Sequence, residues 1–354
     1  MKGTFLFGLC LALATAIGCS STPSHVAYVA LPLSNAVGAY RVNDDSGALL
    51  KIFDSPFAAG TSPSSVVVHP SNKFLYATNQ SENTISLFNI ESSTGVLTEI
   101  TPRTPAGVTP ARMTMDANGG FLFVANRSSN SISAFSIDAG SGALSEVSGS
   151  PFATSTSPAG LTLTPSGKFL YVANSNLGLV SAYSVSSGVL SAVAGSPFVV
   201  GRGPTALIVD SGEHFLYVAN SLDSTVTGLA INGSTGALTT IPDTPIDTGT
   251  APFALAFDST GGFLYAANLL STNISAYSVD STTGKLTEIE KSPFSGPANP
   301  TFLTLAPSGK YFLIGSQSAK TISEYTIDAT TGALANGGVS VTADSAPTSL
   351  SLAK

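Results

Sequence analysis

Four arginines provide the side chains best suited to binding an anion. Arg103, Arg112, Arg127 and Arg202 are four of the five arginines in a chain in which only 10% of residues are charged. A guanidinium group presents a planar fork of N–H donors that matches a carboxylate or a phosphate. The chain therefore has the chemistry to bind a small anion, provided that its fold brings these arginines together.

Residues suited to acid–base or metal chemistry are fewer. The histidines are His25 in the entry segment, His69 at the end of a first strand and His214 in a turn between first and second strands, and no two of them are expected to share a site. A histidine-based metal site or catalytic triad is therefore not expected, and we expect neither a metal nor a cofactor. Glu82 and Asp223 lie in loops between the second and third strands of their units, on the face where we expect the arginines. Either carboxylate could act as a general base.

These residues belong to a repeat with a period near 47 residues. Successive units are offset by 46 to 48 residues, and each contains short runs of alternating apolar residues. Such a period, with four strands per unit, is typical of β-propeller blades. A proline opens each unit and a glycine marks its central turn. The positions are Pro63, Pro110, Pro158, Pro204, Pro252, Pro300 and Pro347, and Gly47, Gly95, Gly142, Gly188, Gly236, Gly284 and Gly332.

The chain ends predict how the ring closes. Within a unit the first strand follows the proline, as in 161–164, and the second is the Phe-Leu-Tyr-Val-Ala-Asn run of 169–174. The third is exemplified by 132–137, and the fourth follows the glycine and ends near Ser-Pro-Phe. The first unit begins at a second strand, 26–31, whereas the chain ends with a lone first strand, 347–353. We therefore predict an all-β, seven-bladed propeller over 25–354, with four antiparallel strands per blade and a C-terminal strand that completes the first blade.

The strand order places the arginines on one face, called here the top face. Connections from the fourth strand to the next first strand, and from the second to the third, lie on this face, where loops converge on the central channel. Arg103, Arg127 and Arg202 fall in such connections, and Arg112 lies two residues after Pro110. We expect them to bind a small anionic ligand; the alternative is that they are solvated loop residues. Arg112 is distinctive because the other units carry uncharged residues at its position: Ser65, Gly160, Ala206, Ala254, Phe302 and Ser349.

Two further repeated positions have structural interpretations. Asp116, Asp210 and Asp258 share one position at the end of first strands, where a carboxylate caps a turn. The asparagine that ends the second strand is expected to bond to nearby backbone. It recurs at Asn79, Asn126, Asn174, Asn220 and Asn268.

The N-terminal segment predicts export. Residues 1–18 have a signal-peptide pattern, with Lys2 before an apolar stretch too short to span a bilayer. The stretch ends in Ala16-Ile17-Gly18-Cys19, which resembles a bacterial lipobox. Cys19 is then the lipidated first residue, 19–24 a tether, and the protein is held at the periplasmic or surface side of the cell envelope. The alternative is an ordinary secretory signal.

Charge restricts the partners. The formal net charge is −7 and there are no basic runs, so nucleic acid is not an expected partner. We expect a monomer that meets a small anion, or a protein or glycan of the envelope, and that touches the membrane only through its lipid.

The repeats resemble a known family. The runs Pro-Ser-Gly-Lys-Phe-Leu-Tyr-Val-Ala-Asn, followed by an Ile-Ser-Ala-Tyr-Ser-like strand and Thr-Gly-x-Leu, are similar to those of seven-bladed lactonase-like propellers. That group includes the propeller-type 6-phosphogluconolactonases and carboxymuconate lactonizing enzymes, and the blades also resemble the YVTN repeats of surface proteins. The resemblance covers nearly all of the chain after the signal segment, and it implies the propeller fold.

The residues that perform catalysis in this family differ from those found at the same positions in this chain. Its catalytic members have His and Arg at the start of inner strands, whereas the seven prolines here are followed by Ser-Ser, Ala-Arg, Ala-Gly, Thr-Ala, Phe-Ala, Thr-Phe and Thr-Ser. Arg112 is shifted by one residue from the family position, which in a regular strand turns the side chain to the other face. We therefore expect a binding module without the catalytic residues. The alternatives are a lactonase that hydrolyses an anionic lactone at the channel mouth, with Arg112 steadying the oxyanion, and a structural surface protein.

Overall fold

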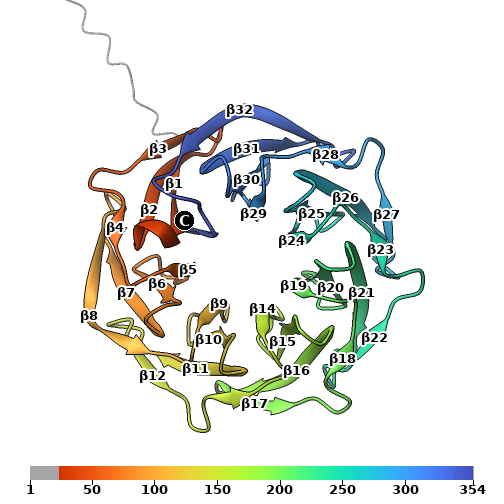
Figure 1. Cartoon of the computed structure of the whole chain (residues 1–354), viewed down its shortest axis with the longest axis horizontal. Helices are drawn as coiled ribbons and strands as arrows, with labels where there is room; N and C mark the ends of the chain where they lie inside the picture. The colour runs from red at the N-terminus through yellow and green to blue at the C-terminus, as the bar shows by residue number, and fades with distance from the viewer. Residues whose placement is uncertain (1–23, 354) are drawn as a thin grey trace, which may run out of the picture.

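A computed structural model describes residues 24–353. Seven antiparallel sheets stand around a central axis like blades (Figure 1). In each blade the first strand lies at the centre and the fourth at the circumference. The predicted all-β, seven-bladed architecture is confirmed.

Blade 1 and blade 2 begin the ring. Blade 1 comprises β1 (Ser24–Leu31), β2 (Ala36–Asn43), β3 (Leu49–Lys51), β4 (Phe57–Ala58) and β33 (Ser349–Ala353), with the 3-10 turn η1 (Pro32–Ser34). Blade 2 comprises β5 (Pro63–Val68), β6 (Phe74–Asn79), β7 (Thr84–Ile90) and β8 (Leu97–Pro105).

Blades 3 to 5 share one strand pattern. Blade 3 comprises β9 (Pro110–Met115), β10 (Phe121–Asn126), β11 (Ser131–Ile137), β12 (Leu144–Glu146) and β13 (Phe152–Ala153). Blade 4 comprises β14 (Pro158–Leu163), β15 (Phe169–Asn174), β16 (Leu179–Ser186), β17 (Val189–Ala192) and β18 (Phe198–Val199). Blade 5 comprises β19 (Pro204–Val209), β20 (Phe215–Asn220), β21 (Thr225–Ile231), β22 (Leu238–Thr240) and β23 (Ile246–Asp247).

Blades 6 and 7 complete the ring. Blade 6 comprises β24 (Pro252–Phe257), β25 (Phe263–Asn268), β26 (Asn273–Val279), β27 (Leu286–Glu288) and β28 (Phe294–Ser295). Blade 7 comprises β29 (Pro300–Leu305), β30 (Tyr311–Ser316), β31 (Thr321–Ile327) and β32 (Leu334–Thr342).

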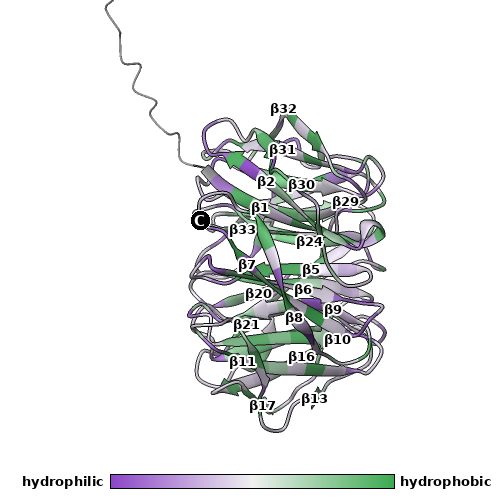
Figure 2. Ribbon diagram, turned by 90° about the vertical axis from the view of Figure 1, so that its left-hand side faces the viewer, coloured by the Kyte–Doolittle hydropathy of each residue, from purple (hydrophilic) through white to green (hydrophobic). Residues whose placement is uncertain are grey.

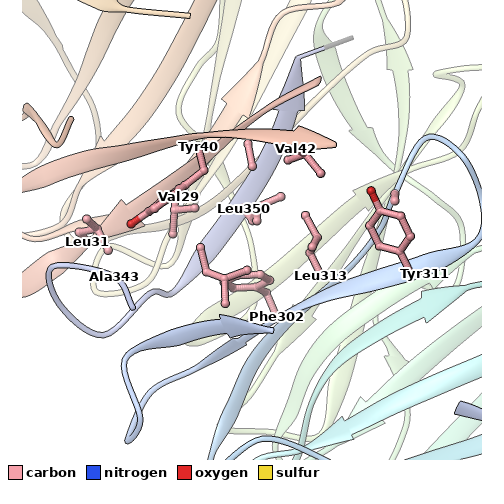
Figure 3. Close-up of a cluster of buried hydrophobic side chains, with 12 residues drawn as sticks. Val29, Leu31, Tyr40, Val42, Phe302, Tyr311, Leu313, Ala343 and Leu350 are labelled. Carbon is pink, nitrogen blue, oxygen red and sulfur yellow. The ribbon is translucent and has the colours of Figure 1, made fainter. Parts of the chain in front are cut away.

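The C-terminal strand closes the ring as predicted. β33 pairs antiparallel with β1, and Tyr28 lies opposite Ser351. The Ser351 hydroxyl also accepts a hydrogen bond from the Val68 amide of blade 2, at 3.0 Å. On the other side, Leu350 packs with Phe302 of blade 7 and Tyr40 of blade 1 in one buried cluster (Figure 3). The last strand therefore joins the first blade to both of its neighbours.

The fourth strand is often shorter than the sequence suggested. In five blades it breaks at a Ser-Pro or Thr-Pro pair, and a two-residue strand then pairs with the third strand. In four of these blades the serine side chain replaces the missing backbone partner. Ser150, for example, accepts the hydrogen bond of the Ala134 amide at 3.0 Å. The serine of the Ser-Pro-Phe motif thus satisfies a backbone donor in the third strand.

A hydrogen bond from a tyrosine of the second strand to a central-turn glycine joins neighbouring blades. The hydroxyl of Tyr76 in β6 donates to the Gly142 carbonyl of the next blade at 2.7 Å. Tyr28, Tyr171, Tyr217 and Tyr265 make the same bond to the central-turn glycine of the following blade. These five glycines adopt φ between 71° and 78°, where residues with a side chain are strained. The repeated Tyr and Gly are therefore parts of one inter-blade contact.

The two ends of the described chain lie on the same face. Val26, near the start of β1, pairs with Ala353 at the end of β33, and these two strands lie next to each other in Figure 2. The connection after β1, at Pro32, lies at the opposite end of the strand. Within 24–353, no helix has the length and apolar character needed to cross a membrane.

Candidate functional site

The top-face mouth of the channel holds a cavity of about 380 Å³. Two positions of the repeat supply twelve of its thirteen lining residues, and Arg112 is the other. The residue after each opening proline contributes Ser64, Ala111, Ala159, Thr205, Phe253, Thr301 and Thr348. The residue that follows the second strand contributes Pro32, Gln80, Arg127, Leu269 and Gln317. The seven-fold repeat therefore builds the cavity wall. The polarity of the wall depends on which residues occupy these two repeat positions in each blade.

The hydroxyl groups of the mouth hold the blades together. Thr205 donates to the Pro252 carbonyl at 3.0 Å, and Thr301 donates to the Pro347 carbonyl at 2.7 Å. Ser64 and Thr348 likewise bond to backbone carbonyls of adjacent blades. A hydroxyl has one proton to donate, so these groups offer a ligand acceptor lone pairs rather than donors.

Arg112 extends from blade 3 across the mouth. Its Nη1 donates to the Thr348 carbonyl at 3.1 Å, and its Cζ lies 5.7 Å from the centre of the Phe253 ring in blade 6. Burial lowers the pKa of Arg112, although an arginine stays charged at neutral pH. Among residues 24–353, no carboxylate lines this cavity or pairs with Arg112. Most of its N–H donors are therefore available to a ligand.

A β-bulge explains why Arg112 reaches the mouth. Pro110 pairs with Asn126 and Arg112 with Ala125, so Ala111 is an extra residue in the strand. The bulge disrupts the alternation of side chains, and both Ala111 and Arg112 line the cavity. The expectation that a one-residue shift turns Arg112 away was therefore wrong, because it assumed a regular strand.

Arg127 is the second cation of the mouth. It is exposed, and its Nε donates to the Ser157 hydroxyl at 3.2 Å. It lies in the loop after β10 and lines the same cavity as Arg112. The structure thus brings together two of the four arginines singled out in the sequence.

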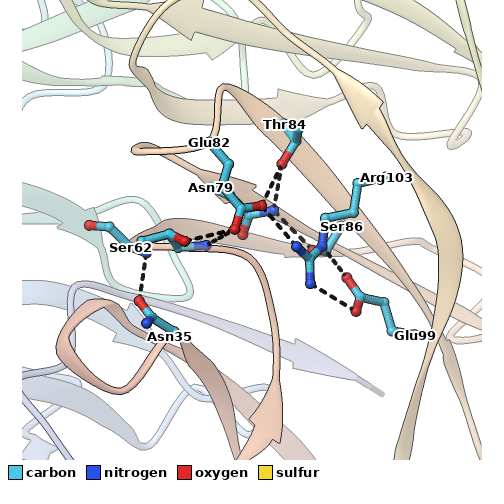
Figure 4. A network of polar contacts seen from close by, with 9 residues as sticks. Asn35, Ser62, Asn79, Glu82, Thr84, Ser86, Glu99 and Arg103 are labelled. Carbon is cyan, nitrogen blue, oxygen red and sulfur yellow. Dashed lines mark hydrogen bonds and ion pairs between the residues drawn. The ribbon is translucent and has the colours of Figure 1, made fainter.

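Arg103 lies within β8 rather than in the connection predicted from the sequence, because the fourth strand of blade 2 runs unbroken to Pro105. It belongs to a cluster of charged side chains away from the mouth (Figure 4). Its Nε donates to Glu99 at 2.7 Å and its Nη1 donates to Glu82 at 2.8 Å. Glu82 also accepts hydrogen bonds from the Thr61 amide and hydroxyl, at 2.9 and 2.7 Å. The Thr61 hydroxyl, more than Arg103, lowers the pKa of Glu82. We call Glu82, Glu99 and Arg103 the rim cluster.

Arg202 is also paired and lies outside the cavity lining. Its Nε donates to Asp223 at 2.6 Å, and its own amide donates to the same carboxylate at 2.7 Å. Ser129 and Ser271 accept backbone amides at the equivalent position of other blades. The carboxylates of Glu82 and Asp223 therefore cap loops, which gives them a structural explanation in place of a general-base role.

The three histidines lie apart from one another, as expected. His25 pairs with Asp44 at 2.7 Å, and His69 bonds to Ser71 and to the Gly119 carbonyl. His214 lies in an exposed turn near Asp210. The described part of the chain holds no group of three or more His, Cys, Asp or Glu that could bind a metal.

The repeated acids and amides have structural roles. Asp116, Asp210 and Asp258 each accept the amide hydrogen of the residue five positions later, which confirms turn capping. The strand-end asparagines differ from the expectation in part. Asn126, for example, donates to the Ser133 hydroxyl at 2.9 Å, and only Asn174 also bonds to backbone. The asparagine side chains donate to Ser and Thr hydroxyls of the third strand, and the sequence of the second strand alone does not predict these partners.

Sequence reasoning missed Phe253, Leu269, Gln80 and Gln317 as mouth residues. A signal was present: the position after the second strand carries Pro, Gln, Arg, Ser, Ser, Leu and Gln in successive blades. Such variety within a regular repeat indicates that core packing does not restrict the residue type at this position. Cys19, the predicted lipidation site, lies outside the described residues.

The whole-chain comparison settles the family. The model of the family described as "Lactonase, 7-bladed beta-propeller" matches residues 20–156 and 160–349. The chain belongs to this lactonase family. The match spans all seven blades and leaves out only residues 157–159 between its two parts. No curated protein matches this lactonase-family chain.

Solved structures agree on the fold. A putative 6-phosphogluconolactonase from Bacteroides uniformis is 20% identical, covers 93% of this chain and 99% of its own, and superposes with a TM-score of 0.83. One from Bacteroides fragilis is 23% identical, with 95% and 99% covered and a TM-score of 0.82. A periplasmic gluconolactonase from Pseudomonas aeruginosa is 20% identical, with 94% and 99% covered and a TM-score of 0.80. At these identities the likeness extends to the fold alone.

Proposed function

We propose that the channel mouth binds a small organic anion, held by Arg112 and Arg127. The observation that carries this proposal is that two cations share one cavity while no carboxylate in residues 24–353 lines it. A partly buried guanidinium without an acidic partner is favourable only if other groups compensate its desolvation. A bound carboxylate supplies that compensation through charge-assisted hydrogen bonds.

The direct test is calorimetric titration of the whole protein with gluconate and with 6-phosphogluconate. We expect binding that Arg112→Ser weakens at least tenfold, since a hydrogen bond to a charged group contributes about 1.5–3 kcal/mol. Ser occupies the same position in blades 1 and 2, as Ser349 and Ser65, so the variant suits the repeat. Equal affinity in the wild type and the variant would contradict the proposal.

Lactone hydrolysis is the second candidate, and membership of the lactonase family favours it. Arg112 could stabilise the oxyanion formed when water attacks a lactone carbonyl. The reaction also needs a base to activate water, and the lining residues in 24–353 include no His, Asp or Glu. We therefore place binding before turnover.

A proton-release assay separates the two candidates. Gluconolactone and its 6-phosphate would be offered to the wild type and to Arg112→Ser at pH 6–7, where spontaneous opening is corrected with a protein-free blank. Turnover that Arg112→Ser abolishes would establish a lactonase. Binding of the acids without turnover of the lactones supports the binding module.

We also propose that a lipid on Cys19 holds the protein at the bacterial envelope. Only residues 20–23 separate Cys19 from Ser24, and the five residue steps reach at most about 18 Å. β1 begins on the face opposite the mouth, so an anchored ring would open its mouth away from the membrane. Cys19→Ser should move the protein from the membrane fraction to the soluble fraction, whereas Cys10→Ser should leave it membrane-bound. Retention of Cys19→Ser in the membrane fraction would refute the anchor.

A further inference from the structure

One wall of the mouth is apolar. Phe253 and Leu269, both in blade 6, line the cavity, and the neighbouring Leu270 is 63% exposed. At the position of Phe253 the other blades carry small residues, four of which have a hydroxyl group. We call Phe253, Leu269 and Leu270 the blade 6 wall. Leu222, at the position of Leu270 in blade 5, is 69% exposed and continues this apolar character toward the next blade.

The two arginines of the mouth lie across the channel from this wall, whereas Thr205, Thr301 and Gln317 lie in the two blades that flank it. In a seven-membered ring, blades 2 and 3 are opposite blade 6, as Figure 1 shows for β6 and β10 against β25. Blade 2 contributes Gln80, and blade 3 contributes Arg112 and Arg127. Arg112 spans the gap, since its guanidinium lies 5.7 Å from the Phe253 ring. An anion bound at Arg112 therefore has the blade 6 wall within reach of its remaining atoms.

This arrangement does not suit a ligand covered with hydroxyl groups. The hydroxyls of Ser64, Thr205, Thr301 and Thr348 already donate to neighbouring blades. A polyhydroxylated body would also place hydroxyls against Phe253 and Leu269, where they lose hydrogen bonds to water without gaining others. An aliphatic or aromatic body would instead gain free energy from burial on the same surface.

We propose that the ligand of the mouth is an amphipathic carboxylate, with its charged group at Arg112 and Arg127 and an apolar body on the blade 6 wall. This proposal rests on the proposed function, because it assumes that the mouth binds an organic anion. It adds the chemical class of that anion and separates it from the polyhydroxy acids produced from sugar lactones.

Two carboxylates with six carbons provide the first test. Hexanoate and gluconate have the same carboxylate group and the same carbon count, and differ in the hydroxyls of gluconate. We expect calorimetric titration of the wild-type chain to give at least tenfold tighter binding of hexanoate. In the series acetate, butyrate, hexanoate, each methylene that reaches the wall should increase affinity about three- to fourfold.

A double variant tests whether the wall is responsible. Phe253→Thr with Leu269→Ser installs residues that other blades already carry at these positions, Thr205 and Ser221, so the fold should tolerate it. The increase in affinity from acetate to hexanoate, measured relative to acetate in the same variant, should be lost. Val199→Thr is the matched control, because Val199 is 76% exposed and lies outside the cavity lining. It should leave the chain-length series unchanged.

The outcomes distinguish the amphipathic-ligand proposal from the proposal of anion binding on which it rests. If gluconate binds as tightly as hexanoate and both depend on Arg112, the amphipathic ligand is refuted while anion binding stands. A chain-length dependence that persists in the double variant would also refute a role for the blade 6 wall. If none of the carboxylates binds, both proposals fail.

Discussion

The channel mouth and the rim cluster contain the same cation in opposite surroundings. At the rim, Arg103 contacts two carboxylates within 3 Å, and its charge is already compensated. At the mouth, Arg112 contacts a backbone carbonyl and an aromatic ring, and it is partly buried. The same side chain therefore serves stability in one place and is available for recognition in the other. What differs is the distance to the nearest carboxylate.

Removing the mouth cation should have the largest effect. Arg112→Ser is expected to weaken anion binding by about 10- to 100-fold, because charge-assisted hydrogen bonds are lost in a partly desolvated cavity. The unfolding free energy should change by less than about 1 kcal/mol, since the lost hydrogen bond is offset by relief of desolvation. Titration and thermal unfolding of the same preparation measure both quantities. A large loss of stability with unchanged affinity would show that Arg112, like Arg103, serves stability and does not bind the anion.

The second cation of the mouth should matter less. Arg127 is exposed, so solvent screens its charge, and Arg127→Gln should weaken binding by about three- to tenfold. Gln80 and Gln317 occupy the same position in blades 2 and 7, which makes this a conservative change within the repeat. The loss should shrink as salt is raised from 0.05 to 0.5 M. An effect equal to that of Arg112→Ser would show that burial does not rank the two cations.

The rim cluster should affect stability alone. Arg103→Gln is expected to cost about 1 kcal/mol of unfolding free energy at pH 7, as for a small network of surface ion pairs, with anion affinity unchanged. The pKa of Glu82 is lowered in the folded state, so its contribution is present above its ordinary pKa and is lost as the pH falls through the folded value. The difference between wild type and variant should therefore narrow between pH 7 and pH 3. A variant that loses anion affinity would remove the distinction between rim and mouth.

Arg202 should give the smallest effect. Its side chain is 78% exposed and pairs with a single carboxylate, so Arg202→Ser should change the unfolding free energy by less than about 0.5 kcal/mol. Anion affinity should be the same as in the wild type, because Arg202 does not line the cavity. A measurable fall in affinity would return Arg202 to the ligand site that the sequence first suggested for it.

The repeat made most of the fold predictable. Opening prolines, central glycines and alternating strands recur seven times. Because each unit has the same turn residues and the same alternation of apolar residues, each forms the same turns and strands. The lone first strand at the C-terminus predicted its pairing with β1, because an incomplete blade leaves backbone groups unpaired. The break in the fourth strand escaped prediction, since it depends on a serine side chain meeting an amide of another strand.

The site was predictable only in part. The sequence alone determined that a ring of seven blades would gather one set of loops at a channel mouth, and that Arg112 would be the sole charge at its repeat position. Tertiary structure alone decided which arginines are free. Glu82, which pairs with Arg103, and Asp223, which pairs with Arg202, lie in loops 21 residues away, and Arg112 donates to a carbonyl 236 residues along the chain. Charge compensation depends on distances in space of a few ångströms, and the order of residues in a chain does not contain those distances.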